Sequence, residues 1–151
     1  MNLSLRKYLL IVNIVFLTLF SSAIRAQTPN SLKTNFPSVG ESLRYTSFIQ
    51  FPQAYISGIC ILKNESESVT GSIFNEFGVS FISFIYNKEK GRIKLVDLSK
   101  PLDKWYIRLT LKQDLKAVLS TLQRGGYQYE NNVRNIIYKF EPMAEQPSAL
   151  Q

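Results

Sequence analysis

Side chains able to carry acid–base or nucleophilic chemistry are scarce in this chain. It contains no histidine, which removes the commonest general base and metal ligand and any Ser-His-Asp or Cys-His arrangement. No glycine-rich phosphate loop or CxxC pair occurs, and the eleven acidic residues are spread singly. We therefore expect no cofactor, no metal site and no catalytic residue. An enzyme would need two carboxylates that only the fold brings together.

Two residues with chemical potential have ordinary structural interpretations. Cys60 lies between Ile59 and Ile61, where a small buried hydrophobic residue is expected. As the single cysteine of the chain it cannot form an intramolecular disulfide. Glu76 lies inside an apolar region next to Asn75, and we interpret it as a residue that stabilises a turn.

Length and composition indicate one folded domain. The chain has 151 residues, of which 45% are hydrophobic and 13% aromatic, enough apolar surface to offset the entropy of folding. The net charge is +7, and its basic residues are scattered along the chain instead of clustered on one segment. Nucleic-acid binding needs such a cluster, so we do not expect a nucleic-acid partner.

The amino terminus has the features of a secretory signal peptide. Arg6 and Lys7 precede the apolar stretch 9–20, and we expect cleavage after Ala26, with Ala23 as the alternative. An uncleaved signal anchor is the other interpretation. Either one predicts export, to the periplasm or the outer membrane. The expected organisation is a signal peptide (1–26), a leader or loop (27–42), one β-rich domain (43–141) and a flexible tail (142–151).

The segment 54–86 is apolar on both of its alternating faces. We expect one strand over 54–63, a polar turn at 64–68 that contains the sequon Asn64-Glu65-Ser66, and a second long strand ending at Tyr86. Asn75 to Gly78 would bend or bulge this second strand. Strands over 43–51 and 92–98 would complete an antiparallel meander, and two more strands are expected over 127–129 and 133–140. Since both faces are apolar, the sheet needs a cover on each side.

A single long helix is expected over 102–122, started by Ser99 and Pro101. One stripe at helical spacing would pack on the sheet: Ile107, Leu111, Leu115, Val118 and Leu122. The first two turns are apolar on the opposite side as well, through Leu102, Trp105, Tyr106 and Leu109. Either the helix breaks near Thr110, or something besides the sheet buries its start.

One helix can cover only one face of the expected sheet, which leaves apolar side chains without a cover. Curling of the sheet into a half-barrel around an apolar cavity would solve this. We therefore predict a mainly β (α+β) fold, a curved antiparallel sheet or half-barrel covered by one main helix. Alternatively, the sheet closes on its own side chains or pairs with another subunit.

The sequence resembles a known family in the strands SGICILK and GSIFNEFGVSFISFIY and the helix LDKWYIRLTLKQDLKAVL. Together with the signal peptide, they are similar to the Bacteroidetes envelope proteins related to the LolA/LolB lipoprotein carriers. The resemblance covers about residues 54 to 122. It implies a curved sheet with a helical lid that binds a lipid or lipoprotein acyl chain in the cell envelope. Ala26-Gln27 stands where many relatives carry a lipid-modified cysteine, so lipid anchoring is not implied.

These observations together predict an exported, non-enzymatic protein that binds a hydrophobic ligand or acyl chain. The expected lining comprises Tyr55, Ile59, Ile61, Ile82, Phe84 and Tyr86, with Trp105 and Leu109 as a movable cover. The alternative function is a structural or interaction protein whose second apolar face is buried by an envelope partner or a second copy. A membrane surface is a further expected partner.

Overall fold

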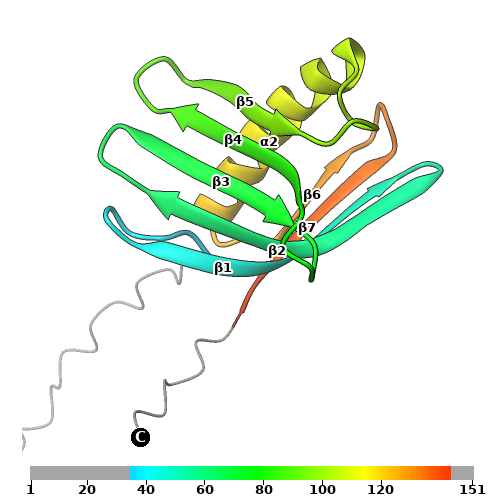
Figure 1. Ribbon diagram of the computed structural model, residues 1–151. Helices are drawn as coiled ribbons and strands as arrows, with labels where there is room; N and C mark the ends of the chain where they lie inside the picture. Colours follow the sequence, from blue (N-terminus) through cyan, green and yellow to red (C-terminus); the bar gives the residue numbers. More distant parts are fainter. Residues whose placement is uncertain (1–34, 144–151) are drawn as a thin grey trace, which may run out of the picture. The chain divides into compact units, whose positions relative to one another are not determined.

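The fold is a curled antiparallel sheet with one helix packed against its inner face (Figure 1). In the computed structural model, which describes residues 35–143, seven strands form one sheet in the order β5-β4-β3-β2-β1-β7-β6. The predicted half-barrel covered by one main helix is confirmed. The predicted signal peptide and all but two residues of the predicted tail lie outside the described residues.

The chain builds this sheet as a meander followed by a helical crossover and a final hairpin. In chain order the elements are β1 (Ser42–Phe51), β2 (Ala54–Asn64), β3 (Ser68–Phe74), β4 (Ser80–Asn87), β5 (Arg92–Leu98), α2 (Trp105–Gln123), β6 (Gln128–Asn131) and β7 (Ile136–Pro142). Strand β7 pairs with β1, so the last hairpin extends the sheet beyond the first strand. Helix α2 therefore carries the chain from one edge of the sheet to the other.

The predicted long second strand is wrong, because the chain reverses direction at Asn75. The Asn75 side-chain oxygen accepts hydrogen bonds from the backbone N–H groups of Phe77 and Val79, at 3.0 and 2.9 Å. Gly78 has a φ of +77°, a conformation that glycine adopts without strain. The Asn-Glu-Phe-Gly segment is thus a hairpin turn between β3 and β4, and the meander has five strands.

The start of the helix and the register of β5 also differ from the predicted ones. Helix α2 begins at Trp105 because the residues after β5 form turns, in which the Leu102 N–H bonds the Ser99 carbonyl at 2.9 Å. In β5 the register shifts so that Ser83 pairs with Asp97 but Phe84 pairs with Leu95, which leaves Val96 as an extra residue. This bulge returns Leu98 to the side of Leu95, whereas strict alternation predicts the opposite side.

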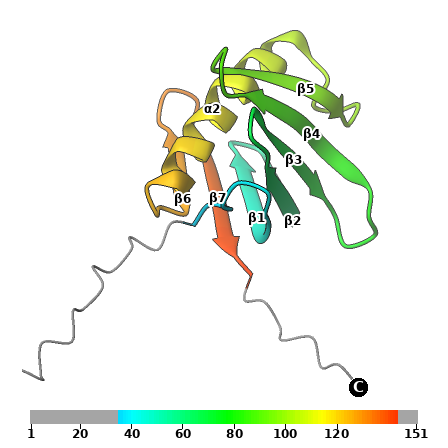
Figure 2. The same cartoon turned by 90° about the vertical axis from the view of Figure 1, so that its left-hand side faces the viewer.

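The core lies between α2 and the inner face of the sheet, defined as the face toward the helix (Figure 2). The helix contributes the predicted stripe, with Leu111, Leu115, Val118 and Leu122 buried and Ile107 packed at its margin. The sheet contributes Tyr45, Ile49, Leu62, Ile73, Ile82, Phe84 and Tyr138, all nearly or fully buried. Cys60 belongs to this core, as predicted, and burial raises the pKa of its thiol well above the ordinary value. The helix is continuous through Thr110, and on its other side Trp105, Tyr106 and Leu109 stay exposed.

One end of the half-barrel is closed by the segment that precedes β1. The Asn35 side chain donates to the Gly125 carbonyl at 2.8 Å, and the Tyr45 hydroxyl donates to the Asn35 carbonyl at 2.7 Å. Burial raises the pKa of Tyr45. On the same segment the Pro37 carbonyl accepts from the Asn64 side chain at 2.8 Å. Because Asn64 is buried and bonded, the sequon is not accessible to glycosylation in the folded protein.

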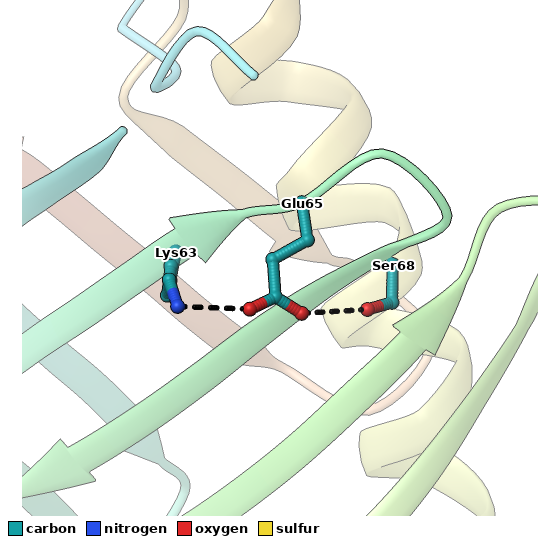
Figure 3. A network of polar contacts seen from close by, with 3 residues as sticks. All are labelled: Lys63, Glu65 and Ser68. Carbon is teal, nitrogen blue, oxygen red and sulfur yellow. Dashed lines mark hydrogen bonds and ion pairs between the residues drawn. The ribbon is translucent and has the colours of Figure 1, made fainter. Parts of the chain in front are cut away.

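The β2–β3 turn at this closed end is held by a small polar network (Figure 3). Glu65 forms an ion pair with Lys63 at 2.9 Å and accepts a hydrogen bond from the Ser68 hydroxyl at 3.3 Å. The hydrogen bond that Lys63 donates, and then the charge of Lys63, hold the pKa of Glu65 below its ordinary value. The turn is polar, and its Ser66 and Glu67 are exposed to solvent.

Candidate ligand-binding site

A hollow of about 550 Å³ lies at the end of the half-barrel opposite the closed end. Three segments far apart in sequence form its walls: the β1–β2 turn, the start of α2 with the connection before it, and the β6–β7 hairpin. All three lie at the same end of the sheet in Figure 1. The lining residues are Phe51, Pro52, Gln53, Ala54, Pro101, Leu102, Tyr106, Ile107, Thr110, Leu111, Arg134, Ile136 and Tyr138. The volume falls within the range typical of small-molecule sites.

The hollow has a buried floor and an exposed rim. The floor consists of Leu102, Thr110, Leu111, Ile136 and Tyr138, all of which are buried. The rim consists of Pro52, Gln53, Ala54, Pro101, Tyr106 and Arg134, all of which are exposed. A ligand that enters past the rim would therefore meet an apolar surface already withdrawn from water.

The polar atoms of the floor already have partners. The Thr110 hydroxyl donates to the Tyr106 carbonyl one helical turn earlier, at 3.0 Å. The Tyr138 hydroxyl donates to the Asp114 carboxylate at 2.8 Å. Within the described residues, the one buried side-chain polar atom without a partner is Asn64 Oδ1, at the closed end. Since both side-chain hydroxyls of the floor are already bonded, an apolar group is the ligand it suits.

Asp114 holds the floor residue Tyr138 in place through a hydrogen bond. Its carboxylate, only 2% exposed, accepts the Tyr138 hydroxyl through one oxygen and the Asn131 side-chain amide through the other, at 2.8 and 2.9 Å. These bonds join α2 to both strands of the β6–β7 hairpin. Burial, and then the charge of Asp114, raise the pKa of Tyr138 far above its ordinary value, so Tyr138 remains a protonated donor. The same two causes raise the pKa of Tyr129.

The turns that position the rim follow from local sequence. Phe51 pairs with Ala54, so Pro52 and Gln53 alone form the β1–β2 turn, where proline removes a donor that the sheet does not need. In the β6–β7 turn the Arg134 N–H bonds both the carbonyl and the side-chain oxygen of Asn131, each at 3.2 Å.

The lining residues predicted from the sequence are not brought together. Strand pairing places Ile82, Phe84 and Tyr86 on the inner face, in the core or packed against it. It places Tyr55, Ile59 and Ile61 on the outer face, defined as the face away from α2. Trp105 and Leu109 are 79% and 52% exposed on the helix. None of these eight residues lines the hollow, so the expectation that they share one cavity is not met.

The predicted lining included no residue of the rim or floor, although Leu102 and Tyr106 stood out as apolar positions near the helix start. Nothing in the local pattern relates the β1–β2 turn to the β6–β7 hairpin, because the helical crossover brings them together. Asp114 did carry a signal, because it interrupts the apolar stripe between Leu111 and Leu115 at a position that faces the sheet. A charged residue on a buried helix face needs a polar partner on the sheet, and Tyr138 and Asn131 supply it.

The outer face of the sheet carries a second apolar surface. Phe48 and Tyr55 stack there with ring centroids 5.6 Å apart, and Ile59, Ile61 and Phe74 lie half-buried on neighbouring strands. No described helix covers this face (Figure 2).

Comparisons with protein-family models, with curated proteins and with solved structures find no match to this chain. No family match therefore supports membership of the LolA/LolB family. In the part of the chain that the structure describes, no helix is long and apolar enough to span a membrane. The same residues contain no group of three or more His, Cys, Asp or Glu side chains arranged to hold a metal ion.

Proposed function

We propose that this protein binds a small hydrophobic molecule, such as an acyl chain, in the hollow at the open end of the half-barrel. The observation that carries the proposal is the hollow of about 550 Å³, whose floor is apolar apart from two hydroxyls that are already bonded. Each methylene group buried there would contribute about 0.8 kcal/mol. The role is non-enzymatic and, with the predicted signal peptide, belongs to an exported protein of the cell envelope.

A relationship to the LolA/LolB lipoprotein carriers is part of this proposal. The resemblance of residues 54–122 implies a curved antiparallel sheet with a helix against it. A half-barrel with one helix is consistent with that expectation, although many proteins share such an architecture. The proposed ligand class, a lipid or lipoprotein acyl chain, agrees with the apolar floor.

The test uses N-phenylnaphthylamine, an uncharged dye whose fluorescence rises in apolar surroundings. We expect the wild-type protein to bind the dye and Tyr106→Asp to bind it about tenfold more weakly, about 1.4 kcal/mol. Tyr106 lies on the rim and is 44% exposed, so the substitution leaves the core intact while placing a carboxylate at the entrance.

Leu109→Asp is the matched control. It lies in the same part of α2 and is 52% exposed, but it does not line the hollow. The proposal fails if the wild-type protein does not bind the dye, or if Leu109→Asp weakens binding as much as Tyr106→Asp. The second outcome would instead favour the helix cover predicted from the sequence.

The outer face supports a second candidate function, an interaction protein whose partner covers that face. The supporting observation is the Phe48–Tyr55 stack with its half-buried apolar neighbours. Native mass spectrometry of protein taken from the envelope separates the two candidates. A lipid-bound monomer supports ligand binding, whereas a lipid-free dimer that Ile59→Asp dissociates supports the interface.

A further inference from the structure

Arg134 is the one charged residue among those that line the hollow. It lies on the exposed rim, in the β6–β7 turn, and its backbone N–H is held by Asn131. Within residues 35–143 the ion pairs are Lys63–Glu65 and Arg108–Asp103. The Arg134 guanidinium therefore has no carboxylate partner in the described part of the chain.

The turn fixes the backbone of Arg134 without using its side chain. Asn131 supplies both acceptors for the Arg134 N–H, and Asn135 follows with a φ of +51°, in the left-handed region that asparagine tolerates. Behind the turn, the bonds of Asp114 to Asn131 and Tyr138 hold the hairpin against α2. A cation is thus held at the mouth of an apolar hollow by a supported backbone.

Two further basic residues neighbour the lining in sequence. Lys100 and Lys104 flank the Pro101–Leu102 part of the lining. Asp103 lies between them in sequence, but its carboxylate is bonded to Arg108, which lowers its pKa. A positive potential at the mouth would attract an anion and disfavour a cation.

We propose that the ligand is an anionic amphiphile, whose apolar chain fills the hollow and whose head group pairs with Arg134 on the rim. This proposal rests on the proposed function and adds the chemistry of the head group. An arginine fork pairs with both carboxylates and phosphates, so a fatty acid and an alkyl phosphate share the required chemistry. The apolar floor supplies affinity, and the rim supplies the preference for a negative head.

The experiment measures displacement of bound N-phenylnaphthylamine by dodecanoic acid, by dodecyl phosphate and by dodecanol. Since the three share one chain and differ in the head group, their affinity ratios isolate the head group. We expect the wild-type protein to prefer the acid over the alcohol, and Arg134→Gln to lower that ratio about fivefold. A fivefold change corresponds to about 1 kcal/mol, which is the upper end of what a solvent-exposed ion pair contributes. At roughly 1 M salt the wild-type preference should shrink, because exposed charges are then screened within about 3 Å.

Arg92→Gln, at the exposed start of β5, is the matched control, and Arg134→Lys tests the charge apart from the arginine fork. We expect Arg92→Gln to keep the wild-type ratio and Arg134→Lys to keep most of it. A stronger effect with dodecyl phosphate than with dodecanoic acid would identify a phosphate head.

Two results overturn the inference in distinguishable ways. If the dye binds but Arg134→Gln leaves the acid-to-alcohol ratio unchanged, the head-group assignment is wrong while the proposed function stands. If the wild-type protein does not bind the dye, both fail.

Discussion

Replacement of Asp114 by alanine tests whether the buried carboxylate holds the floor of the hollow in place. Asp114 lies on α2 and accepts hydrogen bonds from Tyr138 on β7 and Asn131 at the end of β6. It is thus the main polar link between the helix and the β6–β7 hairpin. Alanine removes both acceptors and leaves the buried Tyr138 hydroxyl without a partner.

The expected loss of stability is about 3 kcal/mol. A hydrogen bond to a charged group contributes roughly 1.5–3 kcal/mol, and Asp114 accepts two. Against this, the variant no longer bears the cost of burying a carboxylate, and the partly exposed Asn131 can turn to solvent. The Tyr138 hydroxyl cannot, because the Tyr138 side chain is fully buried.

Urea unfolding followed by circular dichroism measures the effect. With an m-value of roughly 1.5 kcal/mol/M, a loss of about 3 kcal/mol lowers the midpoint by about 2 M. Gln113→Ala, on the adjacent exposed position, should change stability by less than about 0.5 kcal/mol. Tyr138→Phe should destabilise less than Asp114→Ala, since Asn131 still bonds the carboxylate. If Asp114→Ala is no worse than Gln113→Ala, the carboxylate does not secure the hairpin.

Two further predictions concern the sheet. Gly71→Ala should lower the free energy of unfolding, measured in urea, by about 1–3 kcal/mol, because the added methyl group would meet the Phe84 ring. The control Ser57→Ala, at an exposed position on the outer face, should change it very little. The lowered pKa of Glu65 means that its ion pair with Lys63 adds stability above about pH 4.5, the ordinary value, and that this stability is lost as the pH falls through the folded value. Unfolding measured at several pH values should show a shallower acid decline for Glu65→Gln than for the wild type, and an identical decline would refute the assignment.

Local sequence pattern predicted most of the secondary structure. The β2 and β5 strands and the buried stripe of α2 lie where periods of two and 3.6 residues place them. Local errors arose at special turns. At Asn75 the pattern of apolar residues continues across the turn, so periodicity alone did not distinguish a bend from a full reversal. At Val96 one extra residue exchanged the faces of the residues after it in β5.

The sequence by itself indicated that one main helix packs on a two-sided apolar sheet in the part of the chain that the structure describes, and hence a curled fold with apolar surface left over. Only the tertiary structure decided where the hollow lies and which residues line it. The physical reason is that the lining comes from turns and helix starts at one end of the sheet, joined by a crossover between opposite edges. Side-chain periodicity assigns residues to faces of an element, whereas a site at the end of a sheet depends on how the ends of separate elements meet.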